Sequence, residues 1–361
     1  MSEEQDTVDS IFDIPSVLEV DKGRVFSGHL VESEFVLADR VTHSRSRSVL
    51  ISFCNTWPAG HGLAVLDPDS GYFRWVGHGV PSRPAFNGTD GLIRVPGGML
   101  AMEQVYGGGT WLTRYDETLA PSQAEDLPEI ADGHDLRSWR GGLVVADTGH
   151  DRIAWLRPGK PTKTLWRASD TGADTQHVNS VAVVGGRVLA TAFGVKPGAG
   201  WRSACGGFIV DCVSGEILVS GIAQPHSLIA EGLAFWWCES ATSTVWRHTP
   251  GEGTAPVARL RGYLRGLMVT PRHVFVGASA HRRRSRHLGV TVPIEREALH
   301  VDESLLYVID RKTSAVKISS ILHAGSEVFA IAPAPRGVRR PDWADTLSAM
   351  TARFQTAASA F

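Results

Sequence analysis

The sequence predicts an all-β fold, a six-bladed β-propeller whose ring is closed by the two ends of the chain. Three observations support this prediction. Pairs of short apolar strands recur at intervals of 44, 45, 47 and 39 residues, measured between equivalent residues at the start of each pair. Hairpins with turns rich in Gly, Pro, Asp and Ser lie between these pairs. One unpaired strand remains near each end of the chain, and the two strands complete one blade.

The repeating unit is an inner strand pair, an apolar strand followed by a tight turn and a second apolar strand. The sequence contains five complete pairs. They are TDGLIRVPGGMLAMEQ (89–104), GHDLRSWRGGLVVADTG (133–149), VNSVAVVGGRVLATAFG (178–194), PHSLIAEGLAFWWCES (225–240) and LRGLMVTPRHVFVGAS (264–279).

Outer hairpins alternate with the inner pairs. There are six of them, one more than the complete inner pairs. They are GLAVLDPDSGYFRWVG (62–77), TWLTRYDETLAPSQ (110–123), RIAWLRPGKPTKTLW (152–166), GGFIVDCVSGEILVSG (206–221), TVWRHTPGEGTAPVARL (244–260) and LLYVIDRKTSAVKISSIL (305–322).

Two unpaired strands resolve the unequal count. SVLISFCN (48–55) precedes the first outer hairpin, and EVFAIAPAP (327–335) follows the last. If the C-terminal strand becomes the innermost strand of the first blade, the chain forms six four-stranded blades. This closure also protects the edges of the first and last sheets.

The sequence divides into three regions. We expect residues 1–18 to be a disordered tail, 19–341 to be the propeller and 342–361 to contain a short helix on its rim. The segment PDWADTLSAMTARF (341–354) predicts a capped helix with apolar residues on one face. These residues are Trp343, Leu347, Met350 and Phe354.

Composition limits the possible partners and the cellular location. The net charge of −2 over 361 residues argues against nucleic acid as a partner. No apolar run is long enough to cross a membrane, and residues 1–12 are acidic, unlike a signal peptide. The four cysteines show no CxxC spacing, which favours a reducing cytoplasm. The triple glycine at 107–109 lacks the lysine of a phosphate loop, so we expect no nucleotide cofactor.

Polar residues recur where the innermost strands begin, so the fold predicts a ring of them around one channel mouth. These residues are Asp90, His134, Asn179, His226, Arg265 and Glu327. His134 and His226 are the candidate ligands of a divalent metal ion, with Zn, Fe, Mg and Ca not distinguished. The alternative is a water-filled channel whose polar residues hydrogen-bond one another.

Catalytic and substrate-binding roles follow from the same ring. Arg265 is suited to bind a carboxylate or an oxyanion, and Glu327 or Asp90 is suited to act as a general base. His177, two residues before Asn179, is expected to reach the same space and to take part in catalysis. The predicted substrate contacts are Asn179, Glu103 and Glu239 on the strands, with Trp201, Arg202 and Arg284 on loops.

Two long loops are expected to overhang this mouth. Residues 195–206 lengthen a loop of the fourth blade, and residues 280–303 lengthen the corresponding loop of the sixth. Loops in this position can act as lids that exclude water. The basic cluster at 281–287 is suited to attract an anionic or carrier-bound substrate, and the alternative is a solvated basic loop.

Several segments resemble known propeller families. VVADTGHDRIAWL resembles the NHL-type repeat, and roughly residues 85–341 resemble an uncharacterised bacterial propeller family, a conserved domain of unknown function. Members of that family often carry an SRPR-like segment where this chain has SAHRRRSRH. The architecture is more distantly similar to strictosidine synthase, gluconolactonase, paraoxonase and peptidyl-hydroxyglycine amidating lyase. This similarity implies chemistry at the channel mouth, in several cases with a divalent ion on the axis.

Two functions are consistent with these features. The first is a small-molecule enzyme of specialised metabolism, a metal-assisted lyase, cyclase, isomerase or hydrolase. The second is a non-catalytic propeller that binds a protein or a carrier domain. A recognition surface has no need to gather Asp, His, Arg and Glu at equivalent strand starts, so the sequence favours the enzyme.

Overall fold

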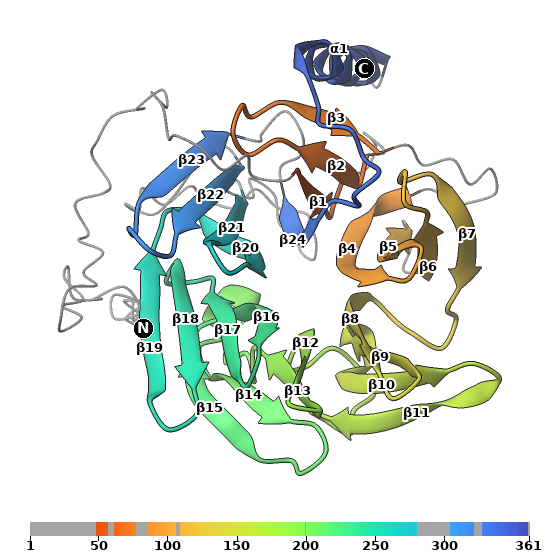
Figure 1. Ribbon diagram of the computed structural model, residues 1–361. Helices are drawn as coiled ribbons and strands as arrows, with labels where there is room; N and C mark the ends of the chain where they lie inside the picture. The colour runs from red at the N-terminus through yellow and green to blue at the C-terminus, as the bar shows by residue number, and fades with distance from the viewer. Residues whose placement is uncertain are drawn as a thin grey trace, which may run out of the picture.

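The structure is a computed structural model that describes residues 48–56, 61–76, 86–105, 109–198, 200–279, 304–320 and 327–359. The predicted tail at 1–18 and the loop at 280–303, with Arg284, lie outside the described residues. Most of the described chain forms six four-stranded antiparallel sheets around a central axis, as predicted (Figure 1).

The first three blades are formed by the described strands up to residue 167, together with the last strand. Blade 1 consists of β24 (Val328–Pro333), β1 (Val49–Phe53), β2 (Leu63–Leu66) and β3 (Phe73–Trp75). Blade 2 consists of β4 (Phe86–Val95), β5 (Gly98–Val105), β6 (Thr110–Tyr115) and β7 (Pro121–Asp126). Blade 3 consists of β8 (Gly133–Trp139), β9 (Gly142–Asp147), β10 (Arg152–Arg157) and β11 (Lys160–Arg167).

The other three blades repeat this arrangement. Blade 4 consists of β12 (Val178–Val184), β13 (Arg187–Ala192), β14 (Gly207–Asp211) and β15 (Ile217–Ile222). Blade 5 consists of β16 (Pro225–Glu231), β17 (Ala234–Glu239), β18 (Thr244–Thr249) and β19 (Gly253–Arg259). Blade 6 consists of β20 (Tyr263–Val269), β21 (His273–Ser279), β22 (Leu305–Asp310) and β23 (Val316–Ser320).

The two ends of the propeller meet in blade 1, which confirms the predicted closure. Strand β24 pairs antiparallel with β1, with Val49 opposite Pro333 and Ile51 opposite Ile331. The amide of Cys54 also donates to the carbonyl of Glu327 at 3.1 Å. The last strand of the propeller is therefore hydrogen-bonded to the first.

The core consists of six apolar clusters, one at each junction between neighbouring blades. Alternate residues of a strand face opposite sides of its sheet, so each blade contributes to two clusters. In β1, Val49 and Ile51 pack toward blade 6, whereas Leu50 packs toward blade 2. This arrangement explains why strands such as β1 and β2 are buried at every position.

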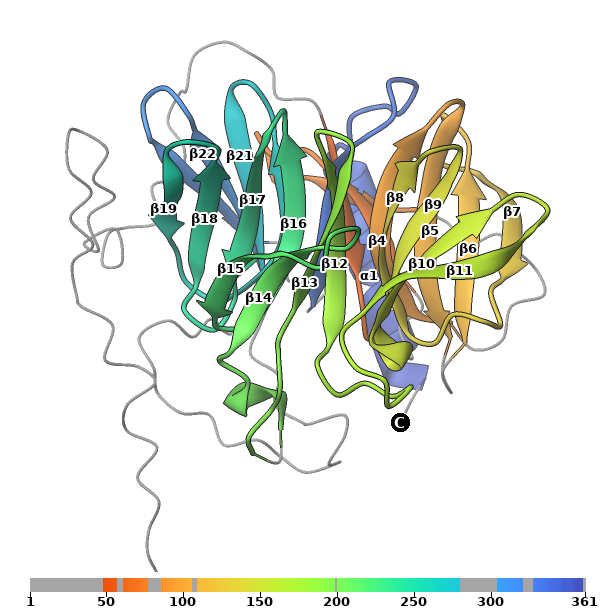
Figure 2. The same ribbon diagram turned by 90° about the horizontal axis from the view of Figure 1, so that it is seen from below.

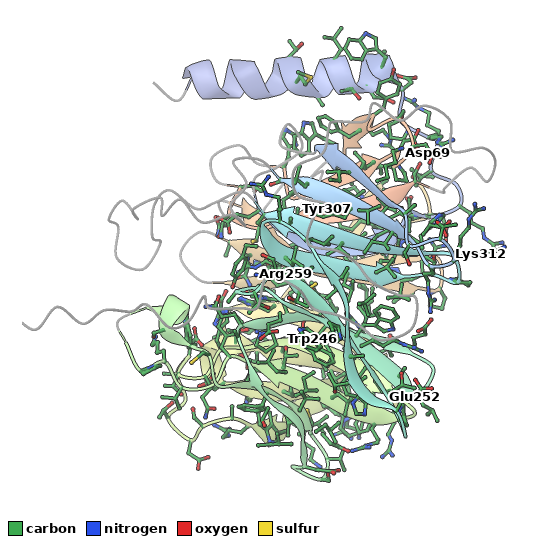
Figure 3. All side chains as sticks on the ribbon, turned by 90° about the vertical axis from the view of Figure 1, so that its left-hand side faces the viewer. Asp69, Trp246, Glu252, Arg259, Tyr307 and Lys312 are labelled. Carbon is green, nitrogen blue, oxygen red and sulfur yellow. The ribbon has the colours of Figure 1, made fainter. Side chains whose placement is uncertain are left out.

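Helix α1 (Trp343–Ser359) lies against β3 on the outside of blade 1 (Figures 1 and 3). The hydroxyl of Thr346 accepts a hydrogen bond from the amide of Phe73 at 2.9 Å, and Ala349 is buried in the cluster of blades 6 and 1. Of the predicted apolar face, Met350 packs against the same cluster, whereas Trp343 and Leu347 are 59% and 51% exposed, so the face that packs overlaps only in part with the one predicted. No described helix has both the length and the apolar content needed to cross a membrane.

Candidate functional site

The six innermost strands form a closed ring in which each contacts the next. They carry the polar residues predicted from the sequence near their starts. These residues are Asp90 in β4, His134 in β8, Asn179 in β12, His226 in β16, Arg265 in β20 and Glu327 immediately before β24. The short helices η2 (Thr148–His150) and η3 (Trp201–Ser203) both project from the lower face in Figure 2.

Irregular strand pairing accompanies the ring in every blade. Between β8 and β9 the register shifts at His134, and between β12 and β13 it shifts at Asn179. The pairing of β20 with β21 breaks between Leu264 and Leu267, on either side of Arg265. A β-bulge leaves a residue outside the regular ladder and changes the direction of its side chain. These bulges therefore help to determine where the ring residues point.

Arg265 is the central cation of the mouth. Its Nη1 lies 3.6 Å from Cys54 Sγ and 3.9 Å from Glu327 Oε2, and Asn55 Nδ2 donates to the same Glu327 oxygen at 2.7 Å. Burial lowers the pKa of Arg265, but its interactions with Cys54, Tyr263 and the carboxyl group of Glu327 outweigh burial and raise the pKa overall. The guanidinium is therefore a permanent positive charge in a largely buried position.

His177 lies beside His134 within a group of aromatic rings. The two imidazole rings meet edge to face with centroids 5.2 Å apart, and Trp201 lies 4.8 Å from His177 on the other side. Nδ1 of His177 is 3.1 Å from Asp174 Oδ2. Burial raises the pKa of Asp174, but the hydrogen bond and charge of His177 outweigh it and hold the pKa below its usual value. This geometry orients the imidazole as in a histidine–carboxylate pair.

Asp90 and His226 are more deeply buried than the other titratable groups of the ring, and each is 2% exposed. Burial raises the pKa of Asp90 to about 7, although His134 and Arg265 oppose the shift. Burial and the charge of Arg265 lower the pKa of His226 well below its usual value, so its imidazole is neutral. Asp90 Oδ1 and His226 Nε2 have no hydrogen-bond partner among the described residues. These two atoms are available to a ligand or to water.

Two of the predicted substrate contacts are instead engaged within their blades. Glu103 is completely buried and accepts hydrogen bonds from Thr113 at 2.6 Å and Tyr115 at 2.7 Å. Glu239 accepts from the indole of Trp246, labelled in Figure 3, at 2.7 Å. The structure therefore does not bring either carboxylate together with Arg265.

The remaining predicted contacts lie near His177. Asn179 is buried, donates to the carbonyl of His177 at 3.2 Å and accepts from Thr191 at 3.1 Å, so it supports the turn that carries the imidazole. Trp201 on η3 covers the ring of His177. The backbone of Arg202 belongs to the same short helix, and its side chain lies outside the described residues.

A buried aspartate organises the loop before His177. The carboxylate of Asp151 is completely buried and accepts from the amides of Thr175 at 2.7 Å and Gln176 at 2.9 Å. It also accepts from the hydroxyls of Thr175 and Ser169. Sequence reasoning identified neither this role nor Asp174, because both depend on an irregular loop without periodicity. The sequence signal for this role is Asp151 itself, the acidic residue that follows the NHL-like turn.

We expect Asp151→Ala to lower the free energy of unfolding by about 2–4 kcal/mol, because it leaves two amides of the loop without their acceptor. Urea denaturation followed by tryptophan fluorescence measures the loss. The matched control is Asp170→Ala, which changes an exposed aspartate in the same loop and is expected to have little effect. Equal stability of the two variants would contradict this account of the loop.

The predicted metal ligands do not converge. His134 packs against His177 and Phe329, whereas His226 packs against Phe193 and Tyr263. Among the described residues, no group of three or more His, Cys, Asp or Glu side chains is placed to hold a metal ion. Protein sites for zinc usually supply at least three such ligands. The described side chains of the mouth therefore do not form a zinc site of this kind.

Comparison with known proteins identifies the family. A family model described as a domain of unknown function, DUF4915, matches residues 100–343, more than half of the chain. The chain belongs to this family. The segments in which the sequence resembles an uncharacterised propeller family fall largely within this match, and the resemblance is confirmed. A comparison with curated proteins found no match.

Solved structures share the fold of this DUF4915 chain. A chain of a nidogen–laminin complex is 12% identical with a TM-score of 0.51, and the match covers 79% of this chain and 97% of the other. A protein of unknown function from Bacteroides caccae gives 12% identity and a TM-score of 0.51, with 80% and 99% covered. Regucalcin from Agrobacterium tumefaciens, a calcium-binding protein, gives 12% and 0.48, with 68% and 78% covered. At these identities the first two show the fold alone, and the third carries no further argument.

Proposed function

We propose that the chain is a small-molecule enzyme that acts on an anionic substrate at the channel mouth by proton transfer. The observation that carries this proposal is the guanidinium of Arg265. It is largely buried, its Nη1 remains 3.9 Å from the nearest Glu327 oxygen, and its Nε has no partner among the described residues. A buried guanidinium that lies this far from the nearest carboxylate oxygen favours the binding of a substrate carboxylate or of a developing oxyanion.

Two further groups of the mouth are the proposed acid and base. His177, oriented by Asp174, is the proposed general base, because a neutral imidazole accepts a proton near neutral pH. Asp90, with a pKa of about 7, is the proposed general acid, because its neutral form donates a proton below that pH. Arg265 would bind the substrate and stabilise negative charge as the proton leaves.

This set of groups supports a lyase, cyclase or isomerase. Removal of a proton next to a carbonyl or carboxylate gives an enolate, which Arg265 stabilises. Return of a proton to a leaving group or to another carbon completes an elimination or an isomerisation. Hydrolysis is the alternative reaction, in which His177 activates a water molecule as the general base. The proposed substrate is a small molecule with an anionic group that can enter the channel mouth.

The proposal is tested by incubating the purified full chain with a small-molecule cell extract and following the extract by mass spectrometry. We expect at least one anionic compound to be converted. Arg265→Gln is expected to reduce kcat/KM by about 100- to 1000-fold, the usual effect of removing an oxyanion donor. The matched control is Arg167→Gln, which removes an exposed arginine of β11.

The catalytic roles are separable by kinetics. His177→Asn is expected to lower kcat more than it changes KM, because the imidazole acts on the proton rather than on the binding of the anion. If Arg265→Gln turns over as fast as Arg167→Gln, the proposal fails. If a compound is retained by the protein without chemical change, the chain is a binding module instead.

A further inference from the structure

The channel contains a cavity beyond the polar ring. Its lining begins one or two residues after the ring position in each innermost strand and continues toward the far end of the strand. Its volume is about 420 Å³, within the range of ligand pockets, and all six blades contribute to its wall. Fourteen of its twenty lining residues are apolar. None of the six ring residues lines it, so it is distinct from the candidate site.

Phe329 separates the cavity from the mouth. Its ring lies 5.5 Å from the ring of His134 and 5.8 Å from the guanidinium of Arg265, and the same residue lines the cavity. The other cavity residues range from buried to exposed. Leu92 and Ala182 are buried, whereas Ala230 and Pro333 are exposed. The cavity is therefore a pocket closed at Phe329 and open on the face opposite the mouth.

The charged groups of the pocket are Asp135 and Arg137 on β8 and Arg94 on β4, which is paired with Glu117 at 2.7 Å, and serines of β8, β12 and β16 complete its polar lining. Asp135 is buried, and its carboxylate accepts from Arg137 Nη1 at 2.6 Å and from the amide of Val181 at 3.1 Å. Arg137 Nη1 also bonds to the carbonyl of Leu136, while its Nε and Nη2 have no bond among the described residues. An apolar interior beside a guanidinium with unused donors is complementary to a chain that ends in an anion.

We propose that this pocket binds the apolar chain of a medium-chain carboxylate, which enters from the face opposite the mouth. The chain extends toward Phe329, and the carboxylate remains near Arg137. Burial of the chain supplies most of the affinity, because the carboxylate of Asp135 already offsets the charge of Arg137. A ligand in this pocket contacts the side chain that packs on His134 and Arg265.

Isothermal titration of the full chain with hexanoate, octanoate and decanoate tests the proposal. We expect one site per chain and an affinity that rises about threefold to fourfold for each added methylene. Ala230→Trp places an indole at the open end of the pocket and is expected to weaken decanoate binding at least tenfold. Ala255→Trp, on the outer strand of the same blade, is the matched control and is expected to bind like the wild type.

The outcomes are distinct. Affinity that does not depend on chain length, or an equal effect of the two tryptophan substitutions, overturns the proposal, because binding is then at the general surface. Circular dichroism and the thermal midpoint establish whether Ala230→Trp is folded. If that variant does not fold, Ile229→Trp is the second variant that blocks the same pocket. The Arg265→Gln variant is expected to bind decanoate as the wild type does. The binding experiment therefore tests the pocket separately from the proposed enzyme function.

Discussion

A chain that ends at residue 326 is expected not to fold. The truncation removes β24, the innermost strand of blade 1, and leaves β1 unpaired on its inner edge. The clusters on both sides of blade 1 lose Val328, Ile331 and Ala332 together with their neighbours. The loss exceeds the 5–15 kcal/mol by which a typical domain is stable. Circular dichroism and the dispersion of amide resonances measure the result.

The control for this truncation is a chain that ends at residue 341. It keeps β24 and removes α1, whose described packing is against β3 and the edge of the cluster shared by blades 1 and 6. We expect this chain to remain folded with a modest decrease in thermal stability. A synthetic peptide of residues 327–341 is expected to restore structure to the shorter chain, because the strand is bound by pairing and burial rather than by sequence continuity. Cooperative unfolding of the shorter chain without the peptide would contradict this role for the closure.

The fold was predictable because the signals are local and repeated. Each hairpin turn and each apolar strand is encoded in a few residues, and the regular spacing makes the blades recognisable. Even the closure followed from the sequence, since SVLISFCN and EVFAIAPAP are strands with no other partners. The apolar face of α1 was less predictable. Its contact with β3 uses Thr346 and Ala349, which are small enough for the helix to lie close to the strand.

The site was predictable in position but not in geometry. Strand order places the starts of the innermost strands together, whereas the direction of each side chain depends on a bulge that the sequence does not mark. Glu103 shows the consequence, because its carboxylate bonds within blade 2 rather than reaching the channel. Phe329 was accessible to sequence reasoning, since it follows Glu327 by two residues and such residues share one face of a strand.

Substitution of Asp90 is expected to stabilise the protein and to remove its activity. Burial raises the pKa of this carboxyl from 3.8 to about 7. The unfolded chain ionises Asp90 above about pH 4, whereas the folded chain holds it neutral until about pH 7. Stability therefore falls as the pH rises between these values, by about 4 kcal/mol in total, and stays reduced above them. Asp90→Asn removes this loss, so its advantage is small at pH 4.5 and largest at pH 8.

Urea denaturation of Asp90→Asn at pH 4.5, 6 and 8 measures this effect, with the exposed Asp126→Asn on β7 as the matched control for the loss of one carboxyl. A difference from wild type that is the same at every pH, or a loss of stability at pH 8, would show that the carboxyl is not held neutral by burial. In the conversion assay the same variant is expected to lose turnover, because an amide cannot supply the proton. The side-chain hydrogen bond of Gln104 to Asp90 does not offset the burial of the carboxyl, and Asp90 Oδ1 has no partner among the described residues. Gain of stability together with loss of turnover would therefore indicate that the cost of burying Asp90 is retained for chemistry at the mouth.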